Sequence, residues 1–126
     1  MQPLALCVHM EKSRVMRLSF LAMGLGIALR DVPESDWGQP LGALCGLEKR
    51  KASAPAVRVP DEMLVMAFFP GSLMDRFLQA IRQSGLSPIR CKAALTDTNR
   101  KWNCGQLFSM LSQEAAAFEA RREDQP

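Results

Sequence analysis

The chain has 126 residues, which is enough for one domain and too few for two, because domains usually contain roughly 100–150 residues. Its residues are 48% hydrophobic and 23% charged, proportions that exclude a wholly disordered or fibrous chain. The net charge of +3 disfavours a dedicated nucleic-acid-binding protein, and the single histidine leaves few groups for acid–base catalysis.

The first half of the chain predicts a strand, a helix, a second strand and a short helical turn. The strands are the apolar runs at residues 4–8 and 27–32, and the turn lies within residues 40–46. The helix covers residues 11–25, with Ser13 as its N-cap and a Gly-x-Gly sequence as its stop. One apolar stripe of this helix consists of Val15, Leu18, Ala22 and Leu25, with Met16, Phe20 and Met23 beside it.

Residues 48–60 differ in composition from both of their neighbours. They are rich in alanine, proline and basic residues, which predicts a flexible connector. This segment carries four basic residues and one acidic residue, so it holds the whole net charge of +3. The two flanking halves together are therefore neutral.

The second half predicts the same kinds of element. A run of seven apolar residues at 63–69 is typical of a fully buried strand, a helix follows at 72–84, and a further strand follows at 89–96. The last helix begins after Asn103. Two capping pairs are predicted, Ser72 with Asp75 and Asn103 with Gln106. The inward residues of the last helix are expected to be Leu107, Met110, Leu111 and Phe118.

These elements predict an α/β fold in which two βαβ(α) halves share one four-stranded sheet with helices packed on it. Both a ferredoxin-like arrangement and a small, mainly parallel sheet satisfy the pattern. The single domain, 1–126, divides into a first half at 1–47, a basic linker at 48–60, a second half at 61–120 and a frayed tail at 121–126. Each half also places a tryptophan, Trp37 or Trp102, before its last helix, as an internal repeat or a common α/β alternation would.

The four cysteines are far apart and form no Cys-x-x-Cys pair, so we expect neither a metal site nor a cofactor. Cys7 and Cys91 lie in apolar runs and are expected to be reduced and buried. No stretch approaches the ~20 apolar residues of a membrane-spanning helix, and the first residues lack the features of a signal peptide. These observations predict a cytoplasmic protein without a membrane segment.

The most distinctive stretch is residues 92–102, with the sequence Lys-Ala-Ala-Leu-Thr-Asp-Thr-Asn-Arg-Lys-Trp. It resembles small bacterial proteins grouped as domain of unknown function 3783. In that family a strand ending in Lys-Ala-x-apolar-Thr continues into x-x-Asn-x-x-Trp and an amphipathic helix. The segment 69–85 is also similar, and the resemblance covers residues 62–118. It implies a small soluble bacterial α/β protein and supplies no mechanism.

Two interpretations of this stretch remain open. In the first, Lys92, Thr96 and Asn99 form a polar pocket that holds an anionic ligand at the end of the strand, with backbone amides near Gly71 and Ser72 contributing. In the second, the threonine and asparagine cap a tight turn, a tryptophan fills the core, and the lysine pairs with a carboxylate or reaches solvent.

Three functions are compatible with the sequence, and none has a predicted catalytic residue. The first is a non-enzymatic module that binds a protein partner, a second copy of itself or a small ligand. The second is an enzyme or regulatory domain that uses the pocket around Lys92, Thr96 and Asn99. The third is an RNA-associated protein that uses Lys49–Arg50–Lys51 of the linker, although three charges make a small nucleic-acid footprint. His9 is expected in a loop.

Overall fold

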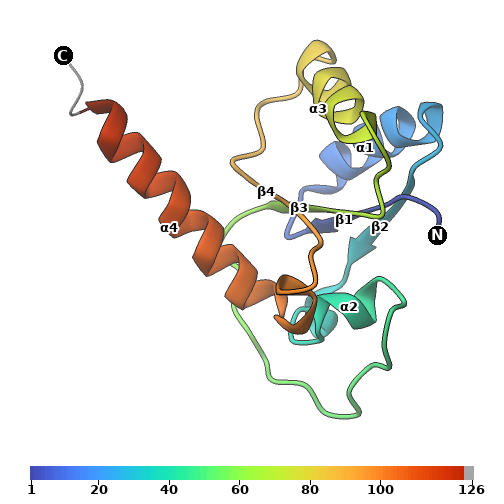
Figure 1. The fold of residues 1–126 in the computed structure, drawn as a ribbon, viewed down its shortest axis with the longest axis vertical. Coiled ribbons are helices and arrows are strands. Elements are labelled where there is room, and N and C mark those ends of the chain that lie inside the picture. Colours follow the sequence, from blue (N-terminus) through green and yellow to red (C-terminus); the bar gives the residue numbers. More distant parts are fainter. Residues whose placement is uncertain (124–126) are drawn as a thin grey trace.

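A computed structural model places one four-stranded sheet between two layers of helices (Figure 1). It describes residues 1–123, and within residues 118–123 the backbone only. The expected α/β class, with helices packed on a four-stranded sheet, is confirmed. Phe118 was predicted to face inward, but its side chain lies outside what is described. A frayed tail was predicted for residues 121–126; residues 121–123 belong to the last helix, and residues 124–126 lie outside what is described.

The sheet has the strand order β2-β1-β3-β4, with β1 at Leu4–Val8, β2 at Ala28–Val32, β3 at Met63–Ala67 and β4 at Cys91–Ala94. Each half pairs its own two strands directly and in parallel, whereas the central strands β1 and β3 are antiparallel. The sheet is therefore mixed, and the direct pairing within each half distinguishes it from a ferredoxin-like plait. The central strands are buried on both faces, which explains their continuous apolar runs.

Helices α1 (Lys12–Gly24) and α3 (Leu73–Gln83) cover one face of the sheet (Figure 1). Both point leucine, phenylalanine, alanine or isoleucine side chains into one core cluster, and both end before a glycine with positive φ. The predicted N-cap at Ser13 is wrong, since α1 begins at Lys12 after Glu11. Ser72 does precede α3, but its side chain makes no capping hydrogen bond.

The other face carries two 3-10 turns, η1 (Glu34–Asp36) and η2 (Asn99–Lys101), and two helices, α2 (Leu41–Leu44) and α4 (Cys104–Glu123). Figure 1 shows α4 running past the edge of the sheet and away from the rest of the fold.

The capping pair predicted at the start of α4 is confirmed. The Asn103 amide N–H donates to the Gln106 side chain, and the Gln106 amide N–H donates to the Asn103 side chain, both at 2.9 Å. Leu107 and Leu111 pack inward as predicted. Met110 is instead 41% exposed, so its predicted inward position is wrong.

The two tryptophan segments hold the second layer together. The Trp37 carbonyl accepts the Cys104 amide N–H at 3.0 Å, and the Trp102 carbonyl accepts the Leu41 amide N–H at 2.8 Å. The indole N–H of Trp37 donates to the Val32 carbonyl at 3.2 Å. Trp37 is buried and Trp102 is partly buried against the same core cluster.

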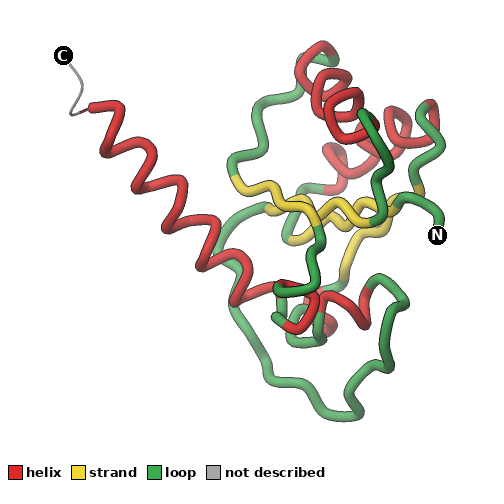
Figure 2. The backbone as a smooth tube through the Cα atoms, in the orientation of Figure 1, coloured by secondary structure: helices red, strands yellow, loops and turns green. Residues whose placement is uncertain are grey.

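The linker at residues 48–60 has no helix or strand and forms the long loop at the bottom of Figure 2. It is nevertheless attached to the fold at several points. Val59 is 1% exposed within the core, and the Gln39 side chain makes reciprocal hydrogen bonds with the Lys51 backbone at 2.8 and 2.9 Å. Gly38 lies so close to the Pro55 carbonyl that a β-carbon would overlap it. The loop is therefore held against the second layer.

A constant spacing of 59 residues relates the first strands of the two halves and the ends of their first helices. Leu6 pairs with Val65, 59 positions later, at the centre of the antiparallel register. The same spacing relates His9 to Phe68, the two non-glycine residues with positive φ (51° and 64°), and Gly26 to Gly85 (72° and 82°). Because β1 and β3 are antiparallel, the corresponding strand ends lie at opposite edges of the sheet.

Candidate functional site

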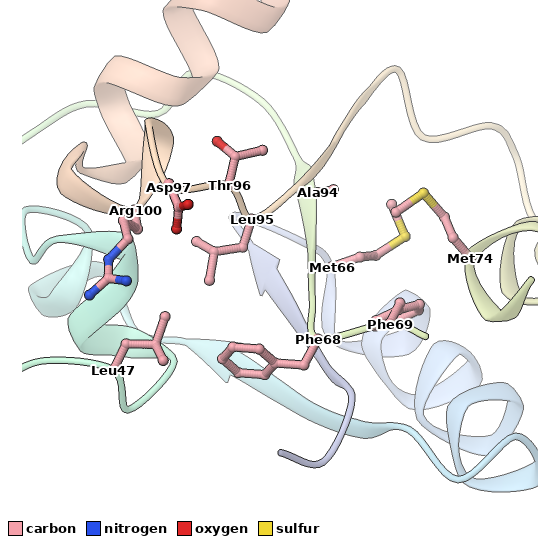
Figure 3. Close-up of a pocket in the computed structure, with 10 residues that line it drawn as sticks. All are labelled: Leu47, Met66, Phe68, Phe69, Met74, Ala94, Leu95, Thr96, Asp97 and Arg100. Atoms are coloured by element: carbon pink, nitrogen blue, oxygen red, sulfur yellow. The ribbon is translucent and has the colours of Figure 1, made fainter. Parts of the chain in front are cut away.

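A cleft of about 450 Å³ opens where the parallel strands β3 and β4 end, and we call it the β3–β4 cleft (Figure 3). Its volume lies within the usual range for small-molecule pockets. The carboxyl ends of parallel strands are also where α/β sheets commonly bind ligands. The lining residues are Leu47, Met66, Phe68, Phe69, Met74, Ala94, Leu95, Thr96, Asp97 and Arg100.

Seven of the ten residues that line the cleft are apolar. Figure 3 shows the side chains of Leu47, Phe68 and Leu95 facing one another, with Met66 and Met74 side by side on the other side of β3. The Leu95 amide N–H donates to the Met66 carbonyl at 2.8 Å, which extends the β3–β4 pairing to the cleft. Such a surface suits the apolar part of a ligand.

The rim carries two opposite charges on one turn of chain. Asp97 and Arg100 are three residues apart, and the Arg100 amide N–H donates to the Thr96 carbonyl at 3.0 Å, which closes that turn. The Arg100 Nε lies 3.9 Å from a Glu48 carboxylate oxygen, with the two side chains 33% and 37% exposed. An ion pair this long and this exposed contributes little, so the guanidinium keeps most of its capacity to bind a ligand.

Asn99 fixes the backbone next to the cleft by hydrogen bonds to Thr96 and Ala94. Its side-chain oxygen accepts the Thr96 amide N–H at 2.8 Å, and its side-chain nitrogen donates to the Ala94 carbonyl at 2.9 Å. Its own amide N–H donates to the Thr96 hydroxyl at 3.0 Å. The residue is 7% exposed, so these contacts hold the corner between β4 and η2.

The structure brings Thr96 and Asn99 together but places Lys92 elsewhere. Lys92 pairs with Leu64 in the sheet register and lines a separate pocket of about 230 Å³ beneath α3. Its Nζ donates to the Ile89 carbonyl at 2.7 Å. The ammonium group thus has a backbone partner, and it does not line the β3–β4 cleft.

Gly71 and Ser72 are exposed in the turn between β3 and α3. Phe69 and Met74, on either side of that turn, line the cleft, whereas the two turn residues do not. Gly71 has a φ of 53°, which suits a residue without a β-carbon.

Thr96 is the one lining residue that the sequence analysis named as a member of a site, and the other nine escaped it, among them Leu47, Phe68, Asp97 and Arg100. Leu47 belongs to the end of the first half, and only folding brings it to the second. Asp97 and Arg100 had one available signal, since they lie on either side of the predicted turn residue Asn99. Phe68 had none, because it reads as the continuation of an apolar strand.

The single histidine lies at the opposite edge of the sheet, after β1. The His9 Nδ1 is 2.6 Å from the Val59 carbonyl oxygen, which can only accept, so Nδ1 carries the proton. The ring also lies against Trp37, with centroids 5.2 Å apart. His9 is therefore the exposed loop histidine that the sequence predicts.

The four cysteines are buried and free. Burial raises the pKa of Cys7 and of Cys104 to about 12 and that of Cys45 to about 11, and it also raises the pKa of Cys91. Each thiol thus stays protonated at neutral pH, which makes it a poor nucleophile.

Arg50, one of the three cations of the Lys49–Arg50–Lys51 run, is already paired. Arg50 donates two hydrogen bonds to the carboxylate of Asp36. These bonds hold the pKa of Asp36 below its usual value. Arg30 adds a longer ion pair to the same carboxylate at 3.6 Å. The linker therefore offers less free positive charge than its sequence suggests.

Within residues 1–123, no three or more His, Cys, Asp or Glu side chains gather closely enough to hold a metal ion. None of the helices in the same described part is long and apolar enough to cross a membrane.

Residues 62–118 match a protein family described as a domain of unknown function, DUF3783. The resemblance predicted over these residues is thereby confirmed. The matched segment contains β3, α3, β4 and η2, and it holds nine of the ten residues that line the β3–β4 cleft, all but Leu47. No curated protein and no solved structure matches the chain.

Proposed function

We propose that this protein is a non-enzymatic module that binds a small amphipathic molecule in the β3–β4 cleft. The observation that carries the proposal is the cleft itself, in which an apolar floor meets a rim with one carboxylate and one guanidinium. The segment matched by the family contains nearly all of it, so the cleft belongs to the part of the chain with known relatives.

The ligand class follows from the two rim charges. A ligand with only an anionic head could bind Arg100 but would be repelled by Asp97. A zwitterionic head satisfies both groups, with its carboxylate on the guanidinium and its ammonium on the carboxylate. An apolar body then covers Phe68 and Leu95. A free amino acid with a large apolar side chain has this chemistry.

A binding role rather than catalysis is supported by the residue types in the cleft. Its only ionisable lining residues are Asp97 and Arg100, and neither is paired there with a hydroxyl, thiol or imidazole nucleophile. The cysteines are buried and protonated, and His9 lies at the other edge of the sheet.

Titration with L-phenylalanine tests the proposal. Changes in the amide NMR spectrum are expected at residues 95–100 and at Phe68. Two analogues, phenethylamine and 3-phenylpropanoate, each lack one charge and are expected to bind about tenfold more weakly or worse. Asp97→Asn and Arg100→Gln should each weaken phenylalanine binding by a similar factor.

Lys92→Ala serves as the matched control, because it removes a cation of the same half that lies outside the cleft. It is expected to leave phenylalanine affinity unchanged. If Lys92→Ala loses phenylalanine binding and Arg100→Gln retains it, the ligand binds in the pocket beneath α3 and not in the β3–β4 cleft. Absence of binding by all three probes, or equal binding of all three, would contradict the zwitterionic cleft.

The two halves are further proposed to be copies of one duplicated βαβ unit in a bacterial cytoplasmic protein. The constant spacing of 59 between corresponding strand, turn and glycine positions supports the duplication. The four free, buried cysteines support a reducing compartment.

A further inference from the structure

Helix α1 presents a row of large apolar side chains to solvent. Met16, Phe20 and Met23 are 62%, 68% and 70% exposed. The spacing of four and then three residues places all three on one face of the helix. Among the other described side chains, only Met1 and Met110 are large, apolar and comparably exposed. The residues of this row, which we call the α1 stripe, lie opposite the buried pair Leu18 and Ala22.

The second half of the molecule provides an internal reference for this face. The spacing of 59 that relates the two halves maps the buried Leu18 and Ala22 onto Phe77 and Ile81, which are buried in α3. The same spacing maps Met16, Phe20 and Met23 onto Asp75, Gln79 and Arg82, all of which are exposed. The fold thus accepts polar residues at all three positions, and the apolar residues of α1 serve no purpose inside the monomer.

A second copy of the same helix is the surface that best fits the α1 stripe. An interface between identical subunits around a two-fold axis must be complementary to itself. When two copies of α1 run antiparallel about a point between Ser19 and Phe20, Met16 of each lies opposite Met23 of the other. The phenylalanine of each copy then lies opposite the small Ser19 of the other. The α1 stripe of one copy is therefore complementary to the α1 stripe of an antiparallel second copy.

The charges next to the stripe agree with this arrangement. The exposed cations on α1 are Lys12 and Arg17, and no acidic side chain lies within the helix. In the antiparallel pair the two copies of Lys12 are ~22 Å apart along the helix axis, at 1.5 Å per residue. Arg17 lies opposite Ala22 of the other copy. The two copies of Arg17 come closest, ~7.5 Å apart along the axis, and each guanidinium already donates to the Ser84 carbonyl of its own chain at 2.7 Å.

The size of the stripe sets the expected strength. Three side chains of roughly 200 Å² each, two thirds exposed, supply about 400 Å² per copy. Stable interfaces bury about 800 Å² per partner. The stripe supplies about half of that area, so we infer that the protein self-associates through antiparallel contact of the α1 stripes as a weak dimer that forms and dissociates with concentration.

Sedimentation velocity over a concentration series tests the inference. The full chain is expected to shift from monomer towards dimer as its concentration rises. The triple variant Met16→Gln, Phe20→Gln and Met23→Gln removes the apolar face without placing opposite charges at the facing positions 16 and 23, and it should weaken association at least about tenfold. The matched control is Met110→Gln, which removes an exposed methionine from α4 and should leave association unchanged.

Disulfide trapping tests the orientation. Met16→Cys and Met23→Cys variants, one of them labelled with ¹⁵N, are mixed and oxidised, and a mixed 16–23 disulfide is expected. Each variant alone should give little cross-linked product, since like positions lie far apart in the antiparallel pair. The native thiols are buried and contribute little background.

Circular dichroism tests whether the triple variant is folded. If the triple variant is unfolded, the single variant Phe20→Gln takes its place, again with sedimentation velocity as the readout. A wild-type chain that stays monomeric at its highest concentration overturns the inference, as does a dimer that persists in the polar variant. Equal cross-linking of Met16→Cys with itself overturns the antiparallel arrangement.

Discussion

The corner between β4 and η2 gives the most direct test of the site's construction. Replacing Asn99 by alanine removes two hydrogen bonds, one from the Thr96 amide and one to the Ala94 carbonyl, at 2.8 and 2.9 Å. Each contributes about 1 kcal/mol net, and a backbone group left buried without a partner adds to the loss. The free energy of unfolding should fall by about 2–3 kcal/mol, and the melting temperature by roughly 8–12 °C for a domain of this size.

Urea and thermal unfolding followed by circular dichroism measure this change. Asn99→Asp keeps the acceptor for the Thr96 amide but turns a carboxylate oxygen towards the Ala94 carbonyl, so it should also destabilise the protein. Thr96→Ser keeps the hydroxyl that accepts the Asn99 amide N–H and should be nearly neutral. If Asn99→Ala changes the unfolding free energy by less than about 0.5 kcal/mol, the asparagine does not hold the corner, and the reasoning fails.

Three further predictions concern the linker and the thiols. Gly38→Ala places a methyl group on the Pro55 carbonyl oxygen and should lower the unfolding free energy by about 3 kcal/mol or more in urea titrations, whereas Gly24→Ala, in open space at the end of α1, should not destabilise. Asp36→Asn should lower the free energy of unfolding at neutral pH. The Arg50 hydrogen bond lowers the pKa of Asp36 in the folded protein below its unfolded value of 3.8, so the stabilisation is present above pH 3.8 and is lost as the pH falls through the folded pKa. The free energies of unfolding of the wild type and the variant should therefore converge in acid. The four buried thiols, with pKa values raised as high as about 12, should react with a thiol-specific reagent at pH 8 only in denaturant, and rapid reaction of the native chain would contradict their burial.

Much of the secondary structure was predictable because its signals are local. The strand at residues 4–8, the cap of α4 by Asn103 and Gln106, and the stop of each first helix near a glycine all depend on residues within a few positions of one another. The same is true of the turn role of Thr96 and Asn99. Capping chemistry and apolar spacing are sufficient for such features.

The cleft was only partly predictable, because its walls come from separate segments. β4 ends at Ala94, before the predicted end at residue 96, and the two positions after it become lining residues. Lys92, two residues back on the strand, faces α3 and its own pocket instead. A two-residue difference in where a strand ends thus decides which side chains reach the cleft.

The exposed stripe on α1 and the mixed strand order of the sheet could not be predicted for the same physical reason. Apolar periodicity indicated that α1 had an inward face, but it could not show that Met16, Phe20 and Met23 face away from every other element. Likewise, two βαβ patterns do not specify how their strands meet in the middle of the sheet. Helix caps and strand runs are interactions between near neighbours in the chain, and they can be read from the residues alone. Burial, strand order and the composition of the cleft depend on contacts between distant residues, and these exist only once the two halves have packed together.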